Sequence, residues 1–212
     1  MSAPSKLHLF IAPGCAYCST MIQTLTELVK QAELAEVTIS NIAADPDNPD
    51  FKGIRSVPAL KYGNAWNTGA MTAEQIKQWL NKSEQDAQIE TINESFEQGQ
   101  LDDIIADIAL ERINMSLLLK MLCDLQTPLT SRIGISAVFE HYEGNERLQA
   151  LLPLICDQAK NEHDSIRVDI AYLLGLTQSQ SAIACLEKLL DDEFDDVKEA
   201  AKESLENLNN SF

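Results

Sequence analysis

Two cysteines separated by two residues, Cys15 and Cys18, are the side chains of this sequence best suited to chemistry. They follow the alternating apolar run of residues 7–11, which predicts a strand. They open the amphipathic segment of residues 16–34, which predicts a helix. At the N-terminus of a helix, two intervening residues let the sulfurs bridge within one turn. The unpaired N–H groups and the positive end of the helix dipole stabilise a thiolate, the reactive form of cysteine. The pair therefore predicts a redox-active disulfide.

A zinc site and an inert buried pair are the other interpretations of two cysteines at this spacing. Zinc needs two further ligands. The remaining cysteines and histidines are scattered singly along the chain: Cys123, Cys156, Cys185, His8, His141 and His163. The strand-to-helix position is the one expected of a redox motif. We therefore expect no metal, and no cofactor other than the Cys15–Cys18 disulfide itself.

The elements that must position this pair predict a mixed sheet with helices packed on it. Strands are expected at residues 7–11, 37–42, 57–62 and 65–67. The last two form a hairpin at the turn signal Gly63-Asn64. A helix through residue 80 begins at Thr72, and Gln75 stands three residues later, as in a capping box. The order of elements indicates an α/β domain over residues 1–82.

The segment Gly53-Ile-Arg-Ser-Val-Pro58-Ala-Leu60 places a proline at the start of a strand, where the ladder can spare its N–H. Together with the cysteine pair, this segment resembles thioredoxins, and the resemblance covers residues 6–81. It implies a thioredoxin-like fold in which Pro58 is cis and packs beside the two cysteines. It also implies that the backbone of Val57 pairs with an incoming peptide as a short β-bridge.

Three departures from the thioredoxin pattern concern the redox pair. Thioredoxins carry a buried aspartate six residues before the first cysteine, where this sequence has Leu9. They carry Trp before the pair and Gly-Pro within it, where this sequence has Gly14 and Ala16-Tyr17. A tyrosine before the second cysteine and the lack of an extra N-terminal strand and helix are similar to glutaredoxins. Ala16 would leave the sulfur accessible, and Tyr17 would shape the surface that meets a substrate.

Residues 83–212 read as helical throughout. Helices are expected near residues 86–97, 101–111, 115–125, 129–141, 146–158, 164–174, 179–190 and 194–208. A period of 31 residues aligns Asp164-Ser-Ile-Arg167 with Asp195-Asp-Val-Lys198, and a weaker copy containing Arg132 lies 35 residues earlier. These residues resemble short HEAT repeats. The resemblance implies an all-α helical repeat domain, a HEAT-like α-solenoid in which stacked helix pairs bury their apolar stripes.

The net charge of −17 belongs entirely to this second part. Residues 1–82 carry seven Lys/Arg and seven Asp/Glu, whereas residues 83–212 carry nine and 26. An acidic surface repels phosphate backbones, so nucleic-acid binding is not expected, while a basic protein partner fits. No apolar stretch is long enough for a membrane helix, and the N-terminus does not resemble a secretion signal. We therefore expect a cytoplasmic protein that does not bind membranes.

The remaining residues that could do chemistry receive structural interpretations. Cys123, Cys156 and Cys185 lie on helical apolar stripes and are expected to be buried unpaired thiols. His8 is expected on the face of the sheet opposite Leu7 and Leu9. Two further groups are also expected to be structural: the tryptophans Trp66 and Trp79, as core or edge residues, and Asp191-Asp-Glu-Phe-Asp-Asp196, as an acidic turn rather than a calcium loop.

The sequence thus predicts a thiol–disulfide oxidoreductase that exchanges with a protein disulfide or dithiol through Cys15 and Cys18, with helical repeats that recognise the partner. One alternative is a glutathione-binding enzyme, because two-domain glutaredoxins and glutathione transferases share this outline. Their Glu-Ser at the start of the helix after the hairpin is replaced here by residues 67–72, Asn-Thr-Gly-Ala-Met-Thr. A non-catalytic interaction scaffold is the other alternative.

Overall fold

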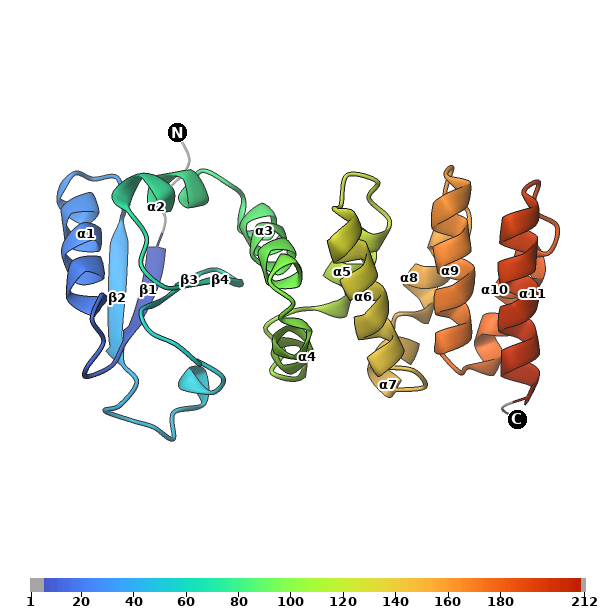
Figure 1. The fold of residues 1–212 in the computed structure, drawn as a ribbon, viewed down its shortest axis with the longest axis horizontal. Coiled ribbons are helices and arrows are strands. Elements are labelled where there is room, and N and C mark those ends of the chain that lie inside the picture. The colour runs from blue at the N-terminus through green and yellow to red at the C-terminus, as the bar shows by residue number, and fades with distance from the viewer. Residues whose placement is uncertain (1–5, 211–212) are drawn as a thin grey trace. The chain divides into compact units, whose positions relative to one another are not determined.

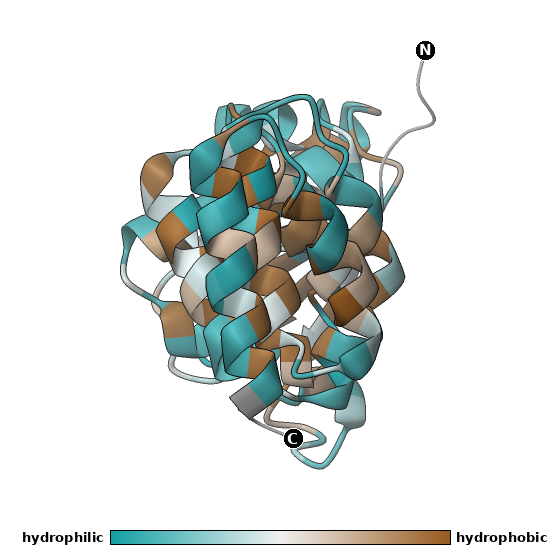
Figure 2. Ribbon diagram, turned by 90° about the vertical axis from the view of Figure 1, so that its right-hand side faces the viewer, coloured by the Kyte–Doolittle hydropathy of each residue, from teal (hydrophilic) through white to brown (hydrophobic). Residues whose placement is uncertain are grey.

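The chain divides into two compact units, Met1–Gln98 and Gly99–Phe212. The computed structural model describes residues 6–210 of them, and Figure 1 shows the order of the elements along the chain. None of the helices in this described range is both long and apolar enough to cross a membrane. Many helix ribbons in Figure 2 change between hydrophilic and hydrophobic colours along their length, as amphipathic helices do.

A four-stranded mixed sheet forms the centre of the first unit. Its strands are β1 (Lys6–Ile11), β2 (Glu36–Asn41), β3 (Ala59–Tyr62) and β4 (Ala65–Thr68), in the order β2-β1-β3-β4. β1 is parallel to β2 and antiparallel to β3, and β3 is antiparallel to β4. In the central strand, Leu9 pairs with Ile39 on one side and with Leu60 on the other. The predicted mixed sheet with helices is therefore confirmed.

The helices α1 (Cys18–Lys30) and α2 (Ala73–Leu80) share one apolar core with the sheet. Fully buried members of this core are Leu9, Met21, Leu25, Leu60 and Ile76. A short 3-10 helix, η1 (Pro49–Phe51), lies in the connection between β2 and β3. At α2 the capping box is complete, because the Thr72 hydroxyl accepts from the Gln75 N–H and the Gln75 side chain accepts from the Thr72 N–H. This prediction from the sequence is confirmed.

The helix α3 (Glu84–Glu97) belongs to the first unit. Its N-cap Ser83 accepts from the Asp86 N–H. The Thr91 hydroxyl donates to the Trp66 carbonyl oxygen of β4 at 2.9 Å, and Ala87 joins the core of the sheet. The polar segment of residues 82–86, predicted as a linker between domains, therefore leads into a helix that packs on β4, and the two units meet after α3.

Helices alone form the second unit within the described residues. They are α4 (Leu101–Ala109), α5 (Met115–Leu122), α6 (Leu129–His141), α7 (Glu146–Gln149), α8 (Leu152–Gln158), α9 (Asp164–Leu176), α10 (Ile183–Leu189) and α11 (Asp195–Asn210), with the 3-10 helix η2 (Gln180–Ala182) before α10. α8 and α10 begin at Leu152 and Ile183, and α9 and α11 at Asp164 and Asp195, a spacing of 31 residues in both cases. This spacing equals the period found in the sequence, while the HEAT-type arrangement stays a prediction.

One predicted helix of this unit is broken. Residues 146–158 were expected to form a single helix, but α7 ends at Gln149 and α8 starts at Leu152. Pro153 occupies the first turn of α8, where its missing N–H costs nothing. In the middle of a longer helix, the same ring would remove a hydrogen bond and clash with the preceding turn. The proline therefore fixes a new helix start.

Two arginines at equivalent repeat positions bind aspartates of the neighbouring helix pair. Arg132 of α6 contacts Asp169 of α9 at 2.5 Å. Arg167 of α9 donates two hydrogen bonds to Asp192, at 2.7 and 2.9 Å, and another to the carbonyl oxygen of Asn161. These pairs join adjacent helix pairs by charge as well as by apolar packing. The predicted acidic turn of residues 191–196 is thus also the anchor of a buried arginine.

Candidate active site

The cysteine pair lies where the chain turns from the end of β1 into α1. Gly14 adopts φ +80°, which L side chains avoid, and the Cys15 N–H donates to the Ala12 carbonyl oxygen at 3.4 Å. Tyr17 is the N-cap of α1, and Cys18 is its first residue. The structure therefore places Cys15 in the turn immediately before the helix, as predicted, while the helix itself begins two residues later than expected.

Cys15 and Cys18 form a disulfide, and the surroundings treat the two sulfurs differently. Cys18 is buried, with 5% of its surface exposed, whereas Cys15 is partly exposed. Ala16 is exposed beside it, and Tyr17 is 62% exposed. The first turn of α1 carries no acidic side chain that would oppose a negative sulfur. One sulfur is therefore accessible to a partner, and the other is protected behind it.

The register of the sheet brings Pro58 to the same edge as the pair. β1 and β3 are antiparallel with Phe10 opposite Ala59, so the end of β1 lies beside the start of β3. The Val57–Pro58 peptide bond is cis, as the resemblance to thioredoxins implied. Pro58 is buried, and its carbonyl oxygen accepts from the Gly69 N–H at 2.8 Å. Val57, which precedes it, is partly exposed.

The interior behind the pair is apolar. Leu9, at the position where thioredoxins carry an aspartate, is completely buried among leucines and methionine of the core. His8 points to the opposite face of the sheet, as predicted, where its ring stacks on Phe10 and its Nε2 lies 2.8 Å from the Ser40 hydroxyl. Burial is the main reason that the pKa of His8 lies below its usual value. Neither residue can serve as an acid or base for Cys18.

The geometry can be compared with known proteins at this point. Residues 5–81 match the family model of a thioredoxin domain. The match ends within the first unit and leaves the helices of residues 99–212 outside it. No curated protein is significantly similar to this chain. The first unit is therefore a thioredoxin-like domain, and its Cys15–Cys18 disulfide fits thiol–disulfide redox chemistry.

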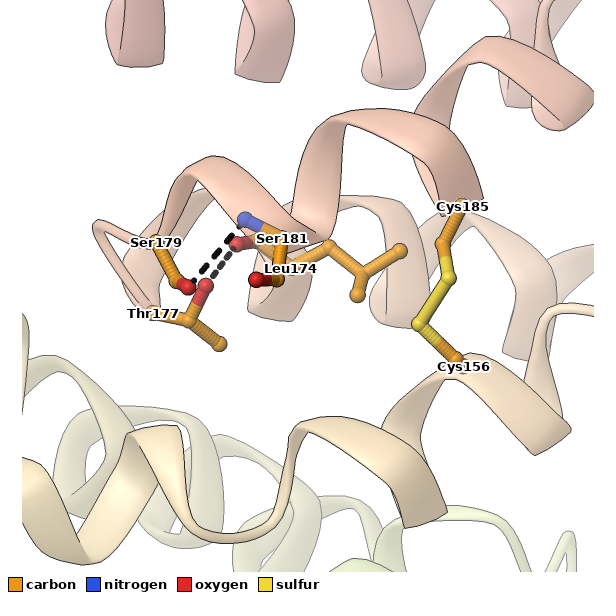
Figure 3. The surroundings of a disulfide bond; sticks show 6 residues. All are labelled: Cys156, Leu174, Thr177, Ser179, Ser181 and Cys185. Carbon is orange, nitrogen blue, oxygen red and sulfur yellow. Dashed lines mark hydrogen bonds between the residues drawn. A yellow bond between two sulfur atoms is a disulfide. The ribbon is translucent and has the colours of Figure 1, made fainter.

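The structure overturns the prediction that all three cysteines of the helical unit are unpaired. Cys156 of α8 and Cys185 of α10 form a second disulfide, shown in Figure 3. The sequence gives one indirect signal for it, because α8 and α10 are equivalent helices of successive pairs and each carries a cysteine. A separation of 29 residues on two different helices is not a recognised pairing motif, so the bond was missed. Cys123 is the free thiol.

Proposed function

We propose that this protein is a thiol–disulfide oxidoreductase that exchanges electrons with protein disulfides or dithiols through Cys15 and Cys18. The observation that carries the proposal is the unequal exposure of two bonded cysteines at the start of α1, within a thioredoxin-like domain. An exchangeable disulfide needs one sulfur that a partner can reach and one that can displace the partner afterwards. Cys15 meets the first requirement and Cys18 the second.

The exchange starts from the reduced pair, which a small dithiol generates from the disulfide. The thiolate of Cys15 attacks one sulfur of the partner disulfide, so that a mixed disulfide forms and the other partner sulfur leaves as a thiolate. The Cys18 thiol then loses its proton and attacks the sulfur of Cys15. The mixed disulfide breaks, Cys15–Cys18 is oxidised, and the partner holds two thiols. The same steps in reverse oxidise a partner dithiol.

The edge beside Pro58 is the proposed place for the substrate backbone. Among the described residues, no backbone hydrogen bond is recorded for Val57, which lies just before β3. An extended peptide can add to such an edge as a short β-bridge and bring its disulfide to Cys15. Tyr17 and Ala16 would then form the surface on the other side of the reactive sulfur, with the 62% exposed tyrosine ring as the largest contact.

We assign the helical unit a role in recognising a basic protein partner. Its acidic excess favours a positively charged surface and disfavours nucleic acids. On α6, Leu129 and Ile133 are 72% and 63% exposed and stand one helical turn apart, which gives the acidic unit an apolar contact as well. A partner of matching chemistry would carry lysines or arginines around an apolar side chain.

Reduction of insulin by dithiothreitol, followed as turbidity, tests the redox activity. The wild-type chain should accelerate the reaction, and Cys15→Ser should abolish the acceleration because the attacking sulfur is gone. Cys18→Ser should retain attack but stop resolution, so a mixed disulfide between Cys15 and an insulin chain should accumulate on non-reducing gels. Cys123→Ser removes a thiol outside the site and should be as active as wild type. A wild-type chain without any acceleration would refute the proposal and favour a scaffold.

A further inference from the structure

The disulfide of the helical unit lies in the outer parts of two short helices. Cys156 and Cys185 are both partly exposed, whereas Cys18 of the first pair is buried. α8 buries Ile155, and α10 buries Leu186 and Leu189, on the sides that face the longer helices. A thiolate from outside can therefore approach the bond without opening the apolar core.

The helical stack has other interactions that hold its helices in place. α9 and α11 pack directly on one another, and Ile170, Leu174, Val197 and Ala201 are completely buried. The turn from α9 to α10 is fixed by its own hydrogen bonds, from the Thr177 hydroxyl to the Leu174 carbonyl oxygen and from the Ser181 N–H to Ser179 Oγ (Figure 3). Cleavage of the disulfide is thus compatible with a folded helical unit.

The third cysteine of the unit does not have these properties. Cys123 is an unpaired thiol, and burial raises its pKa to about 11, with Asp169 adding to the effect. It therefore stays protonated at neutral pH and is a poor nucleophile. The accessible sulfur chemistry of the helical unit is concentrated in the Cys156–Cys185 bond.

We propose that Cys156–Cys185 is a second redox centre, and that the Cys15–Cys18 pair of the same protein reduces and re-forms it. The inference rests on the proposed function, because the first pair supplies the electrons. The thioredoxin-like domain thereby acts on a disulfide that its own chain carries, in addition to disulfides of other proteins. Attachment to one chain raises the effective concentration of one pair at the other.

The transfer balances as a two-electron exchange. After an external dithiol has reduced Cys15 and Cys18, the Cys15 thiolate attacks one sulfur of the Cys156–Cys185 bond. That bond breaks, a mixed disulfide forms, and the other sulfur leaves as a thiolate and takes up a proton. Cys18 loses its proton, attacks Cys15 and displaces the second sulfur of the helical pair, which is protonated in turn. The products are the Cys15–Cys18 disulfide and two thiols in the helical unit.

The test measures how fast the helical pair is reduced in the full-length chain. Two proteins are oxidised with diamide: one carrying Cys123→Ser alone, and one carrying Cys123→Ser together with Cys15→Ser and Cys18→Ser. Both receive a small amount of dithiothreitol, and samples are alkylated over time. Peptide mass spectrometry then gives the reduced fraction of Cys156 and Cys185. Insulin reduction is measured on the first protein and on the double variant Cys156→Ser/Cys185→Ser, which should retain that activity.

We expect the helical pair to be reduced about tenfold faster, or more, when Cys15 and Cys18 are present. A rate independent of protein concentration would assign the transfer to one chain, and a proportional rate would assign it to two copies; either supports the exchange. Equal rates in the two proteins, with insulin reduction intact, would overturn the inference and leave the proposed function standing. Failure of Cys156 and Cys185 to pair after diamide treatment would overturn it as well. Loss of insulin reduction in the first protein would instead refute the proposed function, and the inference with it.

Discussion

Replacement of Asp192 by asparagine tests how much a buried ion pair contributes to the helical unit. The side chains of Arg167 and Asp192 are each 9% exposed and share two hydrogen bonds. Loss of one partner from a buried pair costs about 3–5 kcal/mol because the other charge stays buried. The asparagine oxygen can still accept one of the two bonds, which is worth about 1 kcal/mol. We therefore expect Asp192→Asn to lower the free energy of unfolding by about 2–4 kcal/mol.

The distribution of tryptophans lets the two units be followed separately during urea denaturation. Trp66 and Trp79 are the two tryptophans of the chain, and both belong to the first unit. Their fluorescence reports that unit, while far-UV circular dichroism is dominated by the helices of the second. The circular dichroism midpoint should fall by about 1 M urea or more, and the fluorescence midpoint should not move. The control Glu193→Gln removes an exposed neighbouring charge and should change the midpoint little.

The pH dependence gives the same prediction a sign. The hydrogen bonds from Arg167 hold the pKa of Asp192 below its usual value. A lowered pKa in the folded state stabilises the protein above the unfolded pKa of about 3.9, and this contribution is lost as the pH falls through the folded pKa. The difference between wild type and Asp192→Asn should be complete at neutral pH and shrink below about pH 4. A variant with the midpoint of Glu193→Gln at neutral pH would refute the argument.

Three further changes have defined outcomes. Thr72→Ala removes the N-cap of α2 and should lower the fluorescence-monitored free energy of unfolding by about 1 kcal/mol in urea titrations, with Thr72→Ser as the conservative control. Cys156→Ser with Cys185→Ser opens a loop of 29 residues and should cost the helical unit at most about 3.6 kcal/mol by the loop-entropy relation, measured by circular dichroism; no loss at all would show that the bond does not restrict the unfolded chain. Cys123 has its pKa raised from 9.0 to about 11, so its alkylation by iodoacetamide near pH 8 should be about a hundredfold slower than that of an ordinary thiol, and fast alkylation would contradict its burial.

The sequence predicts best what depends on neighbours along the chain. The Cys15–Cys18 pair, the strand before it and the capping box of Thr72 are local patterns, and the structure contains all three. The cis bond before Pro58 is not evident from local chemistry, since most such bonds are trans, and it was predicted through the resemblance to thioredoxins.

Interactions between stacked helices could not be predicted in the same way. The Cys156–Cys185 bond and the Arg167–Asp192 pair join residues that are 29 and 25 positions apart. The period of 31 residues shows which helices are equivalent, but it does not show which side chains of neighbouring pairs meet. That depends on how far one helix pair is shifted against the next. Cysteine in an apolar stripe also has two physical uses, as a small buried residue and as half of a disulfide, and the pattern is the same for both.

The replacement of an acidic residue by Leu9 changes how the second step of the proposed exchange must work. Cys18 has to lose a proton before it can attack Cys15, and Cys18 is 5% exposed. A carboxylate behind the pair could accept that proton, but Leu9 is completely buried in an apolar core, and His8 faces the other side of the sheet. The proton must therefore leave on the open side, past Cys15, to water or to the thiolate that the partner has just released. A departing partner thiolate is well placed to take it, because it is formed at the same sulfur that Cys18 has to reach. The nature of the partner thus enters the resolving step as well as the attack, and partners whose thiols are more basic should be resolved with less dependence on solution pH.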